Sequence, residues 1–329
     1  AKAFLAGGNL HYSFKGFHVG ATGIFYSYSL PLYPDKSQLY KRFAPEGKSF
    51  WNMSVDYGYV SHRLTMQGET AMGDCGMVAT VNSMSYLLSE KWSLLALYRF
   101  YPYRYYAMYS NSFKAGSDVQ DESGGYVGMR WTPSAKWMVE AYGDVAYFAW
   151  PKYHTMESTY AMDYLVSAVC QLSSFISMGA RYQYKWKNEA TTQRARLYLR
   201  MNRSAWSSKT QVDATWLSGS RGYMASEAFA YRYRWLRLQA SMGYFHTSDY
   251  DSRVYALEPG MLYTMSFGSY FGEGIRCALL AKVDVGSHWL LACKWAMTQY
   301  FDRNHISSGL QQINGSCQSD LELQLKWKW

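Results

Sequence analysis

The chain has 329 residues, of which 49% are hydrophobic, 17% are charged and 18% are aromatic, including 32 Tyr and 13 Trp. Disordered chains are poor in aromatic residues and rich in charge, so this composition excludes disorder. The apolar runs are only a few residues long, whereas a membrane-spanning helix needs about 20. A β-rich chain remains. The formal net charge of +9 is compatible with nucleic acid, an anionic membrane surface or an anionic solute.

Apolar and polar residues alternate with a period of two along most of the chain. One example is the run Ile176, Met178, Tyr182 and Trp186, which alternates with polar residues such as Arg181. Because successive side chains of a strand point to opposite faces, each such segment has an apolar face and a polar face.

Roughly 18 or 19 segments of this kind follow one another, each about ten residues long, which is the length needed to cross a bilayer at a tilt. The expected strands are 2–14, 18–30, 50–61, 63–72, 77–89, 92–106, 124–133, 136–150, 159–172, 175–187, 193–204, 208–218, 222–235, 236–247, 252–258, 261–268, 273–285, 288–300 and 318–329. So high a share of strand is unusual for a soluble domain and is expected of a closed barrel.

The connections between these segments alternate in length. Tight turns are expected at 61–62, 89–91, 134–136, 173–174 and 286–288, and longer polar loops at 30–48, 107–123, 151–158 and 302–317. Short periplasmic turns and long extracellular loops are typical of outer-membrane barrels. This assignment of sides requires the region 252–268 to contribute two strands, separated at Pro259 and Gly260.

Tryptophan recurs at one position after the tight turns, at Trp92, Trp137 and Trp289, and the last strand ends in Trp327 and Trp329. Indole rings favour the membrane–water boundary, so we interpret these five residues as an aromatic girdle. The sequence therefore predicts an all-β fold. It is a single transmembrane antiparallel β-barrel of about 18–20 strands that spans residues 1–329, in the bacterial outer membrane.

The final segment, 320–329 (Asp-Leu-Glu-Leu-Gln-Leu-Lys-Trp-Lys-Trp), resembles the C-terminal signature of outer-membrane barrels. Residues 105–113, 116–128 (Gly-Ser-Asp-Val-Gln-Asp-Glu-Ser-Gly-Gly-Tyr-Val-Gly) and 302–310 (Asp-Arg-Asn-His-Ile-Ser-Ser-Gly-Leu) resemble a family of Bacteroidetes outer-membrane barrels that often follow a helix-hairpin-helix region. This chain lacks the helical Gly-rich hairpin motif, so DNA binding is not carried over and nucleic acid is not an expected partner.

The same resemblance implies strands upstream of Ala1, and the start of the chain has no signal-peptide pattern. We therefore expect either that a signal has been removed or that the chain is the C-terminal part of a longer protein. In the second case an upstream strand, or a strand of another outer-membrane protein, would cover the first edge.

The chain contains none of the common catalytic motifs, so we expect no enzyme activity and no cofactor. The five cysteines and seven histidines are dispersed, which favours neither a disulfide framework nor a metal site. Three carboxylates, Glu140, Asp144 and Asp163, fall on the polar faces of adjacent strands and could meet in the lumen. Acid–base chemistry is one interpretation, and pairing with lumen arginines is the favoured one.

The most informative cluster is basic. The cationic residues on the polar phase of neighbouring strands are Arg181, Lys185, Arg194, Arg196, Arg200, Lys209 and Arg237. If this phase faces inward, it coats one wall of the lumen with positive charge, which favours anions. The alternative is a solvated wall balanced by Asp213 and Asp163, with no meaning for transport.

Two functions follow from these patterns. The first is a channel or transporter for small, anionic solutes. The second is a non-conducting barrel subunit or scaffold of an outer-membrane complex, which the long loops and the lack of a site motif favour. Besides the bilayer, lipopolysaccharide is an expected partner, and Lys41, Arg42 and Lys48 in the first long loop could bind its phosphates.

Overall fold

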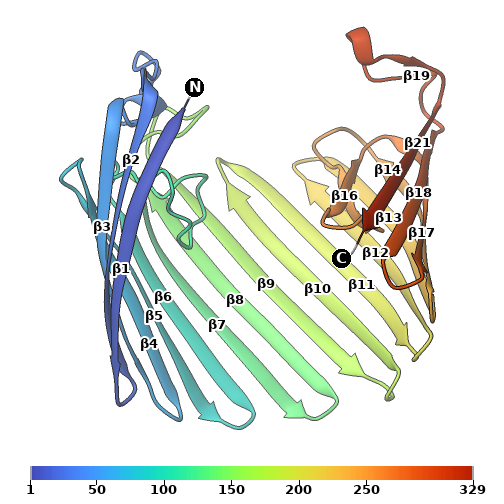
Figure 1. Ribbon diagram of the computed structural model, residues 1–329, viewed down its shortest axis with the longest axis horizontal. Helices are drawn as coiled ribbons and strands as arrows, with labels where there is room; N and C mark the ends of the chain where they lie inside the picture. The colour runs from blue at the N-terminus through green and yellow to red at the C-terminus, as the bar shows by residue number, and fades with distance from the viewer. Residues whose placement is uncertain (1, 328–329) are drawn as a thin grey trace. The chain divides into compact units, whose positions relative to one another are not determined.

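A computed structural model describes residues 2–327 of the chain, and nearly all of its regular structure is antiparallel β-strand (Figure 1). Seventeen strands belong to one sheet. They are β1 (Ala3–Phe14), β2 (Phe17–Leu32), β3 (Gly47–Val60), β4 (Leu64–Gly73), β5 (Val78–Ser89), β6 (Trp92–Tyr101), β7 (Glu122–Ser134), β8 (Trp137–Phe148), β9 (Thr159–Gln171), β10 (Ile176–Lys187), β11 (Ala190–Asn202), β12 (Trp206–Leu217), β13 (Ser220–Tyr233), β14 (Leu236–Thr247), β17 (Glu273–Val285), β18 (Trp289–Tyr300) and β21 (Cys317–Trp327).

Four shorter strands form two separate hairpins, and two turns are 3₁₀-helical. The first hairpin pairs β15 (Val254–Glu258) with β16 (Ser266–Tyr270), and the second pairs β19 (His305–Ile306) with β20 (Ile313–Asn314). The 3₁₀ turns are η1 (Leu39–Lys41) and η2 (Gly309–Gln311). Within residues 2–327, no helix is long and apolar enough to cross a membrane.

The chain divides into two compact units. Unit 1 contains the chain up to Ser134 together with Val139–Val166 and Tyr184–Ala190, and unit 2 contains Ala135–Met138, Ser167–Gln183 and the chain from Thr191 onward. In unit 1 the strands β1 to β7 pair in chain order. In unit 2 the order is β11, β12, β13, β14, β17, β18 and β21.

Tight turns alternate with longer connections along most of the chain, except that the connections at 188–189 and 218–219 also hold only two residues. One set of turns holds two to four residues, as at 15–16, 90–91 and 135–136, and includes the turns that the sequence predicted. Lys15 (φ 44°) and Gly16 (φ 84°) both lie in the left-handed region, which suits the two-residue turns that match strand twist. On the other side of the strands, connections of up to 25 residues carry most of the irregular backbone.

The predicted fold class is confirmed: the structure is all-β, and it is dominated by a many-stranded antiparallel sheet. Two details differ from the prediction. The sheet has 17 strands rather than 18–20, because the segments expected at 252–258 and 261–268 contribute only the separate β15–β16 hairpin and β14 pairs directly with β17. The strand expected at 92–106 ends at Tyr101, because Pro102, which cannot donate a backbone hydrogen bond, begins a loop.

The buried side chains lie where loops or the β15–β16 hairpin cover one face of the sheet. In unit 1 a cluster joins Ala79 of β5 and Tyr101 of β6 to Tyr105 and Val119 of the β6–β7 loop. In unit 2 a cluster joins Met224 and Phe245 of the sheet to Val254 and Tyr270 of the hairpin. We call the covered face the inner face and the opposite one the outer face.

Candidate functional site

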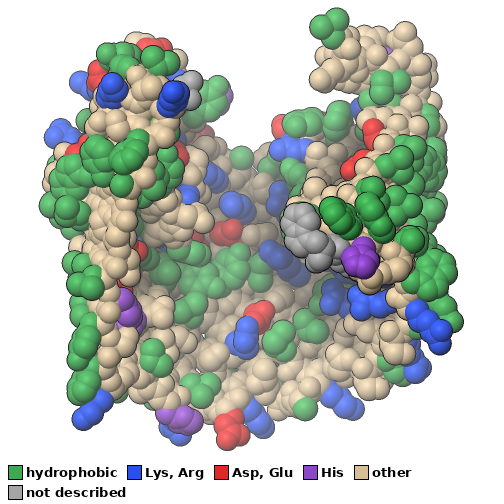
Figure 2. All heavy atoms as spheres, in the orientation of Figure 1, with side chains coloured by type: hydrophobic (Ala, Val, Ile, Leu, Met, Phe, Trp, Pro, Cys, Tyr) green, Lys and Arg blue, Asp and Glu red, His purple; other side chains and the backbone are tan. Residues whose placement is uncertain are grey.

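The outer face is apolar and exposed in both units. Its large side chains include Met84 (44% exposed) and Val127 (64%) in unit 1, and Leu197 (61%), Met242 (54%) and Leu323 (70%) in unit 2. Figure 2 shows hydrophobic side chains along the outer side of the strands that are seen edge-on, and Lys and Arg side chains on the face turned to the viewer. The alternation thus separates an apolar surface from a polar one.

All seven basic residues predicted for the lumen lie on the inner face. Arg196 shows this most directly, because it is in register with Asp213, and Asp213 is in register with the buried Met224 beneath the hairpin. Alternation along β10, β11, β12 and β14 places the others on the same side, namely Arg181, Lys185, Arg194, Arg200, Lys209 and Arg237. Lys185 belongs to unit 1 and the other six to unit 2.

Three of these cations are paired with carboxylates. Arg196 donates to Asp213 at 2.5 Å, Arg237 donates to Asp284 at 2.7 Å, and Lys185 lies 3.5 Å from Asp163. The remaining four have no carboxylate oxygen within 4.0 Å among residues 2–327; they are Arg181, Arg194, Arg200 and Lys209. The inner face of β10 to β12 therefore carries excess positive charge.

Two of the unpaired cations face each other directly. Arg200 of β11 and Lys209 of β12 are register partners, and both lie over the ring of Tyr198, at 5.8 and 5.6 Å from its centroid. Like charges opposite one another destabilise a strand pair. The tyrosine ring offsets part of this repulsion through its negative face, and a bound anion would offset more.

The structure also extends this basic surface beyond the predicted residues. Arg232 of β13 is the register partner of Arg237, and a cavity of about 360 Å³ at the turn end of these strands is lined by Arg203, Arg232, Arg237 and Lys282. Their positions in the alternation could have identified Arg232 and Lys282 from the sequence. Arg203 lies in a turn, where the period-two signal is lost.

Each of the three predicted lumen carboxylates lies on the inner face beside a cation. Glu140 accepts from Arg130 at 2.8 Å, Asp144 accepts from Arg99 at 2.7 and 3.0 Å, and Asp163 pairs with Lys185. The arrangement matches the interpretation as ion pairs with basic lumen residues. Asp144 and Asp163 line one cavity of about 420 Å³, but a cation already engages each of them.

Arg99 forms a fully buried ion cluster that the sequence did not indicate. Its guanidinium has no exposed surface and binds Glu122 as well as Asp144. Glu122 also accepts the backbone N–H groups of Ala115 and Gly116, each at 2.8 Å. One cluster therefore fastens the β6–β7 loop to β6, β7 and β8.

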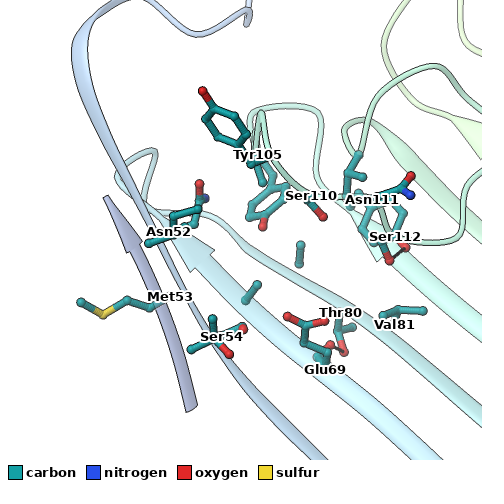
Figure 3. Close-up of a pocket in the computed structure, with 18 residues that line it drawn as sticks. Asn52, Met53, Ser54, Glu69, Thr80, Val81, Tyr105, Ser110, Asn111 and Ser112 are labelled. Carbon is teal, nitrogen blue, oxygen red and sulfur yellow. Dashed lines mark hydrogen bonds between the residues drawn. The ribbon is translucent and has the colours of Figure 1, made fainter. Parts of the chain in front are cut away.

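The β6–β7 loop, residues 102–121, lies against the inner face of unit 1. Figure 3 shows Tyr105, Ser110 and Ser112 of this loop across a cavity from Asn52 and Glu69 of the sheet. The cavity holds about 360 Å³. Burial raises the pKa of the Tyr105 hydroxyl, so this loop residue is a neutral phenol at all ordinary pH values.

Asp121 ends this loop beside a cation. Its carboxylate lies 3.0 Å from the Lys152 ammonium and accepts the backbone N–H of Trp150 at 2.9 Å. Burial raises the pKa of the Asp121 carboxyl, and the ammonium opposes that shift. The neighbouring β8–β9 connection is thus tied to the same loop.

The β15–β16 hairpin is fastened to the inner face of unit 2 by Glu258. This buried carboxylate accepts two hydrogen bonds from Arg276 of β17, at 2.8 and 3.0 Å, and one from the Tyr270 hydroxyl. Lys294 of β18 lies 4.0 Å away. The short strands, expected to be part of the wall, instead cover it.

Four of the five predicted girdle residues lie on the outer face next to the tight turns. Trp289 and Trp327 are register partners with stacked rings 5.9 Å apart. The ring of Trp92 stacks on that of Trp131, with centroids 5.2 Å apart. Trp131 was not among the predicted girdle residues. Trp137 is 46% exposed. The fifth, Trp329, lies outside the described residues.

The structure also places the basic residues of the first long loop and two of the histidines. Lys41 ends η1, Arg42 follows it, and Lys48 is the second residue of β3. Two of the dispersed histidines do meet: His11 and His18 stack at 5.4 Å and lie 3.7 and 4.0 Å from Asp56. This contact arises from the β1–β2 register, which spacing alone did not reveal. Within residues 2–327 there is no group of metal-ligating side chains that could hold an ion.

No protein-family model matches the sequence, and no curated protein matches it. Among solved structures, the siderophore receptor PirA from Acinetobacter baumannii is similar at 6% identity and a TM-score of 0.48, over 99% of this chain and 71% of that one. The FrpB iron transporter from Neisseria meningitidis is similar at 8% identity and a TM-score of 0.49, over 99% and 71%. The copper transporter OprC is similar at 10% identity and a TM-score of 0.46, over 90% and 60%.

Proposed function

We propose that the chain forms the wall of an outer-membrane β-barrel that admits small anionic solutes. Its location in a membrane is supported by the outer face. Leaving a side chain such as Leu323 or Met242 in water instead of burying it costs about 1.5–3 kcal/mol of free energy. Dozens of large apolar side chains are exposed here. A bilayer covers such a surface, and strands of 10 to 16 residues are long enough to cross it.

The observation that carries the proposed selectivity is the unpaired charge on the inner face of β10 to β12. Arg181, Arg194, Arg200 and Lys209 have no carboxylate within ion-pair distance among the described residues, and two of them oppose each other in register. A structural wall would be expected to balance its charges. Rings and walls of Arg and Lys in a pore attract anions and exclude cations.

Solute flux into liposomes tests this function. Proteoliposomes should swell faster in an organic anion such as gluconate than in a neutral sugar or an organic cation of similar size. The double variant Arg200→Gln/Lys209→Gln should lose most of this preference, because it removes the facing cations. The control Lys91→Gln/Lys136→Gln removes two charges from tight turns and should retain it. Equal swelling for all three solutes would contradict the proposal.

The alternative, a non-conducting subunit or scaffold, is favoured by one specific observation. Both the β6–β7 loop and the β15–β16 hairpin lie on the inner face, each fastened by a buried ion cluster. Such elements narrow the space beside the wall. Proteoliposomes that exclude all three solutes, from protein that co-purifies with other outer-membrane proteins, would support this alternative.

A further inference from the structure

A cavity of about 420 Å³ lies between the basic wall and the β15–β16 hairpin, entirely within unit 2. Its floor comes from β10, β11 and β12, and one side comes from the hairpin. This volume falls in the range of small-molecule sites, about 300–1,000 Å³. The residues that matter for the argument are Arg181, Arg194, Arg196, Thr215, Tyr255 and Phe267.

The cavity has more guanidinium groups than carboxylates. It is lined by Arg181, Arg194 and Arg196, with Asp213 as its one carboxylate within the described residues. Asp213 is already engaged, because it accepts from Arg196 and from the Gln211 amide. Two guanidinium groups are left for a ligand. A guanidinium presents paired N–H donors in a plane, which matches the two oxygens of a carboxylate.

The hairpin side of the cavity is aromatic. The rings of Tyr255 and Phe267 stack with centroids 5.6 Å apart and planes 9° from parallel. Phe267 is 59% exposed, although it belongs to the hairpin that covers the inner face. Arg194 lies 5.9 Å from the Tyr255 centroid, so the flat apolar surface and the positive charge adjoin.

The hairpin's two faces explain this exposure. Val254, Glu258 and Tyr270 form the face that packs on the sheet, against Phe245 and Arg276. Strand alternation turns Tyr255 and Phe267 to the other face. The anchoring residues therefore hold the aromatic pair in a fixed position beside the arginines, without help from a ligand.

We propose that this cavity, the Arg–aromatic pocket, binds small carboxylates that carry a flat apolar ring. The carboxylate is held by Arg181 and Arg194, the ring packs on Phe267 and Tyr255, and the Thr215 hydroxyl is a further polar contact in the lining. The inference deepens the proposed function, on which it rests, by naming a class of anion and the place where it binds.

Calorimetric titration of the detergent-solubilised protein tests the pocket without requiring transport. Benzoate combines a ring with a carboxylate, acetate lacks the ring, and benzamide lacks the charge. We expect benzoate to bind at least about tenfold more tightly than acetate or benzamide. Acetate lacks the ring contact and benzamide lacks the carboxylate contact, and both contacts are desolvated in the pocket. Equal affinity for benzoate and acetate would overturn the proposal, as would equal affinity for benzoate and benzamide.

Variants assign the binding to the pocket. Phe267→Ala and Arg194→Gln should each weaken benzoate binding by about tenfold, and Arg194→Lys should restore part of it because it keeps the charge. Leu257→Ala is the matched control, because Leu257 is the register partner of Phe267, is 64% exposed and does not line the cavity. Unchanged benzoate binding in both Phe267→Ala and Arg194→Gln would overturn the assignment.

The outcomes separate the two proposals. If the protein prefers anions in the flux assay but binds benzoate no better than acetate, the pocket is wrong and the proposed function stands. If benzoate binds through Arg194 and Phe267 while flux shows no anion preference, the site is supported and passage through the barrel is contradicted.

Discussion

Glu227 is a carboxylate on the outer face, at the middle of β13. It is exposed there, and it accepts hydrogen bonds from Ser208 and, at 2.5 Å, from Thr210 of the neighbouring strand. A charge on the lipid face of a barrel is costly, although less so for Glu than for Lys or Arg. The two hydroxyl donors replace part of the lost hydration. Period-two alternation does not predict a carboxylate here, because the pattern expects an apolar residue at each outer-face position.

Individual residues can test which face meets lipid. Met84 lies at the middle of β5 on the outer face, and its neighbour Ser83 lies at the same depth on the inner face. Met84→Lys should lower the free energy of unfolding in lipid vesicles by about 2–4 kcal/mol, whereas Ser83→Lys should change it little. Urea titration of both variants measures the difference. A larger loss for Ser83→Lys would reverse the assignment of faces.

The buried cluster around Arg99 gives a second prediction at this scale. Arg99→Met leaves Glu122 and Asp144 buried without their cation, so it should destabilise the fold by about 3–5 kcal/mol. The matched variant Arg130→Met breaks the more exposed pair with Glu140 and should cost about 0–1 kcal/mol. Because Glu122 holds the β6–β7 loop, trypsin should also cut sooner after Lys114 in Arg99→Met. Equal stability of the two variants would contradict this account.

At the scale of elements, the β15–β16 hairpin shows where sequence periodicity was insufficient. Its residues alternate as wall strands do, since a hairpin lying on a sheet also has two faces. Length was the usable signal: the expected segments 252–258 and 261–268 are shorter than the roughly 9–11 residues that cross a bilayer. In the structure the two strands have only five residues each. The expected side of the membrane for each loop is unaffected. The connections keep alternating between the two sides whether this region contributes two strands to the sheet or none.

The β6–β7 loop shows a different limit. The sequence correctly predicted an irregular connection here, but it did not predict what the loop packs against. Tyr101, Tyr105 and Val119 pack on Ala79, and Arg99 binds the loop through Glu122. These contacts join residues far apart in the sequence, so no local pattern encodes them. By contrast, alternation alone predicts that Arg181 and Arg194 lie on the inner face.

Removing the anchor of the hairpin should free it from the wall. Glu258→Ala leaves Arg276 without its bidentate partner, and breaking a buried pair costs about 3–5 kcal/mol. We expect amide hydrogen exchange across residues 254–270 to accelerate by about a hundredfold or more. Asp251→Ala, an exposed change just before β15, should leave exchange in the hairpin unchanged. Slow exchange in Glu258→Ala would show that other contacts hold the hairpin.

At the scale of the whole molecule, the antiparallel sheet has an edge strand in each unit. Within unit 1, β1 pairs with β2 alone among the described residues, and within unit 2, β21 pairs with β18 alone. Hydrocarbon offers no water to unpaired backbone groups, each of which would cost several kcal/mol. In a bilayer each of these two strands therefore needs a second pairing partner, which closure of the sheet into a barrel would provide.

The measurement that tests the central claim most directly is the reversal potential of the purified protein in a planar bilayer under a KCl gradient. The excess positive charge on β10 to β12 predicts that chloride carries most of the current. The reversal potential should therefore have the sign expected of a chloride-selective pore. The variant Arg200→Gln/Lys209→Gln should move this potential toward zero. A cation-selective potential, or one that this variant leaves unchanged, would contradict the assignment of the basic wall to anion passage.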